Sequence, residues 1–144
     1  WYKDNYAKAN EFDLVNNCTT NYDSTKFYSV NFKQTELYLR YIDKSNFVSG
    51  RYITKWRSYF NECEKEFKKN PQNDGPPEGL DYDFILCTQE IDETLALIDK
   101  PKTISVKIEE NTGTVCIDVY MKLKFHLTKE NNKWLIDDIE NISN

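Results

Sequence analysis

Two aspartates bracket a tyrosine in the middle of the chain, as Asp81, Tyr82 and Asp83. On an extended segment both carboxylates point to the same side, because side chains alternate with a period of two. A carboxyl group in an apolar pocket has a raised pKa and can act as a general base. In that interpretation Asp83 is the base, and Tyr82 or Gln89 positions a carbonyl group. The structural alternative, which we favour, is that one Asp caps a turn and the other accepts hydrogen bonds from backbone amides after Gly79.

The other reactive side chains do not form a known catalytic or metal-binding motif. His126 is the one histidine, on the polar side of a predicted strand, and its sequence neighbours do not suggest a catalytic triad. The four cysteines lack the CxxC spacing of zinc sites, and the chain has no GxGxxG, P-loop or HExxH motif, so we expect no metal and no cofactor. Local sequence favours buried thiols at Cys63 and Cys87, whereas an oxidising compartment would allow three disulfide pairings. We interpret Asp137 and Asp138 as charges at a strand end.

Composition restricts the class of protein. The chain has 144 residues, enough for one domain, with 39% hydrophobic and 15% aromatic residues and a mean hydropathy of -0.77. So many aromatic residues exclude full disorder. The net charge is -5, divided into +3 over residues 1–72 and -8 over residues 73–144. This acidity argues against nucleic-acid binding. No apolar run approaches the ~20 residues that span a bilayer.

The first half of the chain has helical spacing of apolar residues. It predicts helices over 32–43 and 50–68, with Asn31 and Ser49 as their N-caps. We expect residues 1–25 to be an N-terminal extension, weakly structured or packed on the domain, and residues 26–144 to form a single domain that starts with a short strand. The second helix has one inward stripe, made of Ile53, Trp56, Phe60, Cys63 and Phe67.

The second half has the alternation of β-strands. After a loop over 69–79, residues 80–91 are predicted to be a short strand or a helix start, followed by a weak helical stripe that Pro101 ends. Strands are predicted over 104–108 and 115–127, the latter bent or bulged near its middle because of its length. A last strand contains Trp134, Ile136 and Ile139. Helices followed by antiparallel strands indicate an α+β fold.

Several segments together resemble a bacterial domain family of unknown function, found largely in exported Bacteroidetes proteins. They are the segment LDYDF at 80–84 with TQE at 88–90, and the closing segment WLIDDI at 134–139. The resemblance covers about residues 27–142. It implies the cone-shaped fold of nuclear transport factor two and ketosteroid isomerase, in which N-terminal helices pack in the concave face of a curved, mainly antiparallel sheet. It also implies a periplasmic or surface-anchored location, directed by a signal segment upstream of Trp1.

Cone folds leave a pocket at their open end, and this gives the functional prediction. We expect a non-catalytic domain that binds an unknown small molecule or protein, without a membrane span, and with a homodimer through the sheet as one arrangement. One alternative is an isomerase or dehydratase that uses Asp83 and Tyr82. The other is a toxin-immunity or interaction protein that pairs through an acidic face. The predicted ligand-binding residues are Trp56, Tyr59, Tyr82, Asp83, Gln89 and Tyr120.

Overall fold

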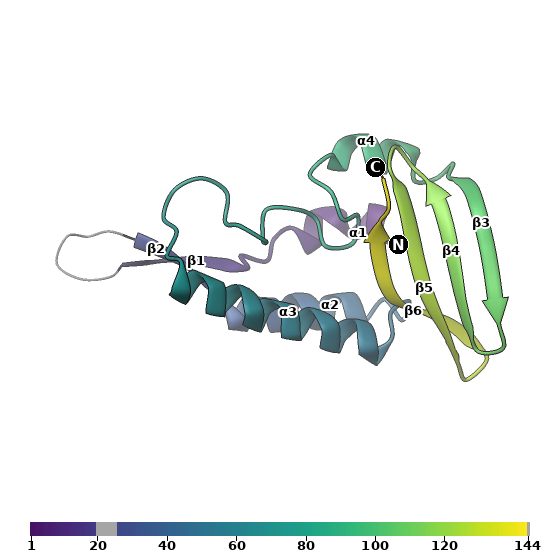
Figure 1. Ribbon diagram of the computed structural model, residues 1–144, viewed down its shortest axis with the longest axis horizontal. Helices are drawn as coiled ribbons and strands as arrows, with labels where there is room; N and C mark the ends of the chain where they lie inside the picture. Colours follow the sequence, from purple (N-terminus) through teal and green to yellow (C-terminus); the bar gives the residue numbers. More distant parts are fainter. Residues whose placement is uncertain (20–25, 144) are drawn as a thin grey trace. The chain divides into compact units, whose positions relative to one another are not determined.

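The structure of the chain is a computed structural model that describes residues 1–19 and 26–143 (Figure 1). The described residues form an α+β fold with four helices and two antiparallel sheets, which confirms the predicted class. They belong to two compact units, Trp1–Lys44 with Ile53–Asp81 and Ser45–Tyr52 with Tyr82–Asn144. The elements are α1 (Tyr2–Ala9), β1 (Val15–Thr19), β2 (Lys26–Val30), α2 (Phe32–Asp43), α3 (Gly50–Lys69), α4 (Ile91–Leu97), β3 (Lys102–Glu109), β4 (Thr112–Asp118), β5 (Lys122–Glu130) and β6 (Lys133–Asn141).

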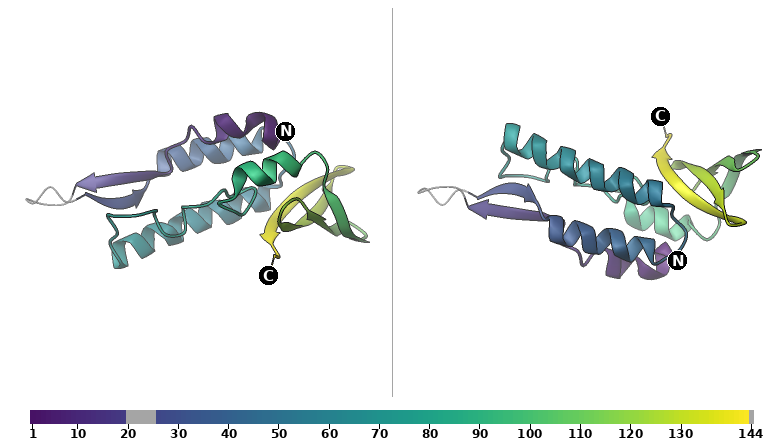
Figure 2. Two further views of the ribbon diagram at one scale, coloured as in Figure 1. Left: turned by 90° about the horizontal axis from the view of Figure 1, so that it is seen from above. Right: turned by 90° about the horizontal axis from the view of Figure 1, so that it is seen from below.

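The two helices predicted from helical spacing are α2, in the first unit, and α3, which belongs to the first unit from Ile53 onward. Asn31 caps α2 as predicted, since its side chain accepts a hydrogen bond from the backbone amide of Gln34 at 3.3 Å. Helices α2 and α3 lie side by side (Figure 2), and Arg57 forms a bidentate ion pair with Glu36 between them. The inward stripe of α3 is confirmed, because four of its five residues are buried: Trp56, Phe60, Cys63 and Phe67.

The N-terminal extension has regular structure in its described part. Strand β1 pairs antiparallel with β2, the short strand predicted at the start of the domain. Helix α1 and its flanking residues contact α2 through aromatic rings, with Phe12 edge-on to Tyr38 and Trp1 against Tyr41. The extension is therefore part of the first unit.

In the second unit, β3, β4, β5 and β6 form a four-stranded meander in that order (Figure 1). The prediction of one bent strand over 115–127 is wrong, because the chain reverses at Val119–Met121 and forms two strands. Residue Tyr120 has a φ of 85° at this turn. Val115 lies opposite Phe125 in the resulting register, so odd-numbered residues share a face before and after the reversal. One continuous strand and this hairpin therefore give the same alternation of apolar and polar residues in the sequence.

Strand β6 contains a bulge that changes which side chains share a face. Its register against β5 shifts between His126 and Leu127, which leaves Asp137 as the extra residue. The register and the period of two define two faces of the sheet. The polar face carries Lys107, Thr114, Cys116, Lys124, His126 and Asp138, and the apolar face carries Val106, Val115, Ile117, Leu123, Phe125, Ile136 and Ile139.

The segment before α3 completes the outer edge of β6. Phe47 and Ser49 exchange backbone hydrogen bonds with Ile136, at 2.8 and 2.9 Å. The hydroxyl of Ser49 also accepts a hydrogen bond from the amide of Arg51 at 3.2 Å, which confirms Ser49 as a helix cap. The start of α3 is therefore fixed beside the strand that carries Asp137.

Residues 80–91 form neither the short strand nor the helix start that their apolar run predicts. The segment folds as a series of turns, with one isolated antiparallel bridge between Asp83 and Thr88. Cys87 has a φ of 53°, a conformation that continues neither a strand nor a helix. The predicted helix before Pro101 is present as α4. No helix within residues 1–19 and 26–143 is both long enough and apolar enough to cross a membrane.

Candidate functional site

The six predicted ligand-binding residues belong to both units. Trp56 and Tyr59 lie on α3 in the first unit, where their rings meet edge-on at 5.3 Å. Tyr82, Asp83 and Gln89 lie in the turns that precede α4, in the second unit. The sixth residue is Tyr120, at the turn between β4 and β5, and it is 56% exposed.

Asp83 has the geometry of the structural interpretation. Its side chain is buried, and Oδ1 accepts hydrogen bonds from the backbone amides of Ile85 at 2.9 Å and Leu86 at 2.6 Å. Its backbone amide donates to Thr88, and its carbonyl accepts from the amide of Cys87. These bonds hold the turn in place. They support a structural role for Asp83, since the carboxylate is engaged by the backbone.

Tyr59 is the predicted residue that lines a pocket in the first unit. Its hydroxyl donates to the carbonyl of Gly79 at 2.8 Å. Gly79 has a φ of 81°, and a Cβ there would lie 3.0 Å from the Tyr59 hydroxyl, so the position requires glycine. The pocket beside Tyr59 has a volume of about 270 Å³. It is lined by Tyr59, Glu62, Cys63, Glu66, Phe67, Asn70, Gln72, Glu78 and Gly79. Its three glutamates each contact a nearby polar side chain, those of Lys65, Asn70 and Gln72.

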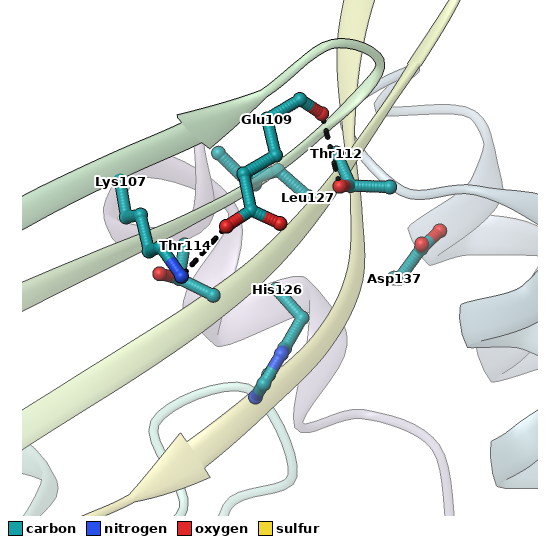
Figure 3. A pocket seen from close by; sticks show the side chains of 8 residues that line it. Lys107, Glu109, Thr112, Thr114, His126, Leu127 and Asp137 are labelled. Atoms are coloured by element: carbon teal, nitrogen blue, oxygen red, sulfur yellow. Dashed lines mark hydrogen bonds and ion pairs between the residues drawn. The ribbon is translucent and has the colours of Figure 1, made fainter.

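A pocket of about 280 Å³ in the second unit contains side chains from all four strands of the meander (Figure 3). We call it the sheet pocket. It is lined by Lys107, Glu109, Thr112, Gly113, Thr114, His126, Leu127 and Asp137. None of the six predicted residues is among them. The hairpin register brings these groups together, since Lys107 lies opposite Thr114 and Thr114 lies opposite His126.

Two groups that line the sheet pocket, Nε2 of His126 and Oδ1 of Asp137, are buried polar atoms without a hydrogen bond among the described residues, and Asp137 is the charged one. Its side chain is 17% exposed, and Oδ2 lies 3.6 Å from Nη1 of Arg51. Oδ1 is buried and accepts no hydrogen bond from the described residues. Arg51 is engaged elsewhere, because its Nη2 donates to the hydroxyl of Thr128 at 3.0 Å. A buried carboxylate oxygen without a donor is costly, and a bound water, an ion or another donor group is one of the explanations for it.

The other ionisable groups around the sheet pocket contact one another. Lys107 and Glu109 form an exposed ion pair at 2.6 Å, which Figure 3 shows on β3. Nε2 of His126 lies 3.2 Å from the carboxylate of Glu140, without the geometry of a regular hydrogen bond, and this close neighbour lowers the pKa of Glu140 below its ordinary value. His126 is half-buried and lines the pocket, so its position on the polar face is as expected but it is not simply solvent-exposed.

Sequence reasoning missed Asp137 as a site residue. The interpretation as strand-end charge is wrong, because the side chain is mostly buried at the bulge within β6. A signal was present in the spacing of apolar residues. Trp134 and Ile136 are two apart, whereas Ile139 follows after three, and such a change of phase requires an extra residue in the strand.

Cys63 and Cys116 carry free thiols in the described part of the chain. Cys63 is buried as predicted, and burial raises the pKa of its thiol. Cys87 is half-buried, with Sγ 3.5 Å from the carbonyl oxygen of Ile139. The side chain of Cys18 lies outside the described residues. Among the residues that are described, no three His, Cys, Asp or Glu side chains gather closely enough to hold a metal ion.

No protein-family model, curated protein or solved structure matches this chain. The resemblance to the exported Bacteroidetes family, and the cone fold that it implies, therefore stay predictions. The candidate site depends on the geometry of the sheet pocket.

Proposed function

We propose that this chain is a non-catalytic binding domain whose sheet pocket takes a small polar molecule with a hydrogen-bond donor. The buried Oδ1 of Asp137 is the observation that carries the proposal. Oδ1 has almost no exposed surface, so a ligand donor reaches it only when the Asp137 side chain turns toward the pocket. The new hydrogen bond would then remove the cost of leaving this oxygen unsatisfied, about 1–3 kcal/mol.

The charge and size of the pocket favour an ammonium compound as the ligand. The lining carries one cation, Lys107, against the two anions Glu109 and Asp137. Lys107 pairs with Glu109, whereas Asp137 has a long contact of 3.6 Å with the largely exposed Arg51, so Asp137 is the lining charge that a further positively charged donor complements. A volume of about 280 Å³ is at the small end of ligand sites, which typically measure about 300–1,000 Å³. We therefore propose a ligand of a few heavy atoms, or the amine end of a longer one.

The surroundings of Asp83 and the charges on the polar face of the sheet support ligand binding in preference to the two alternative functions. The enzyme alternative needs Asp83 as a free base, and its carboxylate oxygen accepts two backbone hydrogen bonds. The interaction-protein alternative needs an acidic sheet face. On the polar face, Glu109 pairs with Lys107, and Glu140 lies near both Lys124 and His126, so positive and negative groups alternate there.

A titration monitored by NMR tests the proposal with three probe compounds. 2-Aminoethanol carries the ammonium group, ethylene glycol replaces it with a hydroxyl, and acetate is an anion. We expect 2-aminoethanol to shift the amide signals of Thr112, Thr114 and Asp137 in a saturable way, with smaller effects from the other two. A ceiling of about 1.5 kcal/mol per heavy atom limits the Kd of this four-atom probe to about 40 µM or weaker.

Two aspartate variants on β6 provide the control. Asp137→Asn keeps the shape of the side chain but removes its charge, and we expect it to weaken 2-aminoethanol binding at least about tenfold. Asp138→Asn removes the same charge from the neighbouring residue, outside the pocket lining, and binding should be unchanged. Equal binding by wild type and Asp137→Asn, or shifts confined to residues away from the pocket, would contradict the proposal.

We also propose that the helices pack in the concave face of the sheet to form a cone, and that the protein is exported to the periplasm or cell surface. The apolar face of the meander supports the cone, since such a face needs a partner surface. The resemblance alone supports export. An experimental structure would test the cone, and fractionation of the cells that naturally produce this chain would test the location.

A further inference from the structure

Strand β3 is an open edge of the four-stranded sheet. All eight of its residues are exposed, and within the described residues it pairs on one side only, with β4. Three large aliphatic side chains are exposed there, at 47% for Ile104, 57% for Val106 and 62% for Ile108. An exposed aliphatic edge strand is a surface for pairing with another strand. The other edge of the sheet is β6, which Phe47 and Ser49 cover at Ile136.

The hairpin between β3 and β4 determines which backbone groups point to the open edge. Its closing residues Glu109 and Thr112 form a hydrogen-bonded pair across a two-residue turn, and such pairs alternate along an antiparallel ladder. Lys107 accordingly faces β4, with its carbonyl oxygen 3.1 Å from where a Cβ on Gly113 would lie. The peptide groups of Val106 and Ile108 therefore face outward.

We propose that two copies of this chain pair through β3, antiparallel, with the twofold axis at Val106. In this arrangement Val106 lies opposite Val106 of the second copy. Ile104 is the extra residue of a bulge in β3, and it comes near Ile108 of the second copy at the end of the ladder. Lys102 and Glu110 lie just beyond the two ends of the ladder, where their long side chains bring opposite charges together twice. The interface is isologous, as a twofold axis requires. This proposal uses β3 and is independent of ligand binding in the sheet pocket.

Neighbouring registers are less favourable. Centring the axis one residue earlier, on Ser105, places the charge of Lys102 opposite the aliphatic Ile108. Centring it one residue later puts Lys107 directly opposite Lys107 of the second copy, and like charges in that position are destabilising. An axis between two residues would set an outward-facing peptide group opposite an inward-facing one. The register at Val106 avoids all three conflicts.

The ladder is short, which determines the strength we expect. The bulge between Thr103 and Ser105 ends regular pairing on one side, and the hairpin turn ends it on the other. An interface of this size is in the class of weak, reversible contacts. Sedimentation velocity from about 10 µM to about 1 mM should therefore show a monomer–dimer equilibrium that depends on concentration.

Charge substitutions test the location of the interface. Val106→Lys places two ammonium groups opposite each other on the twofold axis, and we expect the dimer Kd to rise at least about tenfold. Leu97→Lys is the matched control, because Leu97 is also an exposed aliphatic residue, on α4. Its Kd should equal that of wild type. A chain that stays monomeric at every concentration, or equal Kd values for Val106→Lys and Leu97→Lys, would overturn the proposal.

Cysteine substitutions test the register under mild oxidation. Cα atoms of a hydrogen-bonded antiparallel pair lie about 5.5 Å apart, within the range of a disulfide. Val106→Cys should therefore form a covalent dimer above the background of wild type. Ile108→Cys should not, because its counterpart would be about four residues away along the ladder, more than about 13 Å. A disulfide in Ile108→Cys as extensive as in Val106→Cys would overturn the register.

Discussion

Replacing Asp137 with alanine is expected to stabilise the ligand-free protein, although most substitutions of buried residues destabilise. The buried Oδ1 accepts no hydrogen bond from the described residues, which costs about 1–3 kcal/mol. The contact of Oδ2 with Arg51 at 3.6 Å returns at most about 1 kcal/mol, because the Arg51 side chain is 67% exposed. The cost of the unsatisfied Oδ1 therefore exceeds the stabilisation from the contact with Arg51. We therefore expect Asp137→Ala to raise the free energy of unfolding by about 1 kcal/mol.

The neighbouring aspartate should respond in the opposite direction. Oδ1 of Asp138 accepts a hydrogen bond from the backbone amide of Ile139 at 2.8 Å. Ile139 is buried, so Asp138→Ala leaves a protected amide without its acceptor, and we expect a loss of about 1–2 kcal/mol. The two alanine substitutions at adjacent positions thus change the free energy of unfolding in opposite directions. A general effect of lowering the negative charge would give both the same sign.

Urea unfolding followed on the amide NMR signals of β5 and β6 measures both changes in the second unit itself. Saturating 2-aminoethanol should then raise the stability of wild type by about 1.4 kcal/mol for each tenfold excess over its Kd, and should leave Asp137→Ala unchanged. If Asp137→Ala is destabilised as much as Asp138→Ala, Oδ1 contributes to the fold. In that case the argument for a ligand at the sheet pocket fails.

Three further predictions concern single side chains. Glu64→Ala should cost about 1–3 kcal/mol, measured by urea unfolding, because its carboxylate accepts the amide of buried Val30 at 2.8 Å. Tyr120→Gly should raise the melting temperature and add about 0.5–1 kcal/mol, since glycine adopts a φ of 85° without strain; an unchanged or lower value would contradict this. The lowered pKa of Glu140 beside His126 gives stability that is present above the ordinary carboxyl pKa of about 4.3 and is lost as pH falls through the folded-state pKa. Glu140→Gln should therefore lose less stability than wild type between about pH 5 and pH 3, in urea midpoints measured across that range.

Local periodicity was sufficient to predict the helices, because each depends on residues near in sequence. Asn31 and Ser49 cap α2 and α3 as expected, and the stripe from Trp56 to Phe67 is buried. The same reasoning failed at Tyr120, because a reversal there needs a positive φ and the sequence offers neither glycine nor asparagine. A tyrosine at the turn left the alternation unbroken, so one strand and two gave the same signal.

The sheet pocket could not be predicted because its residues are far apart in sequence. The register of the hairpins is the information that a prediction would need. Its lining comes from four strands, and Lys107, Thr114 and His126 become neighbours only through two successive hairpin registers. A turn placed at Tyr120 determines the second register, and the Glu110 turn determines the first. The phase change between Ile136 and Ile139 then locates the bulge, and the bulge residue is Asp137. An acidic residue at a change of phase inside an apolar strand is thus a stronger sign of a site than the same residue at a strand end, because the bulge turns its carboxylate toward groups that regular pairing would keep apart.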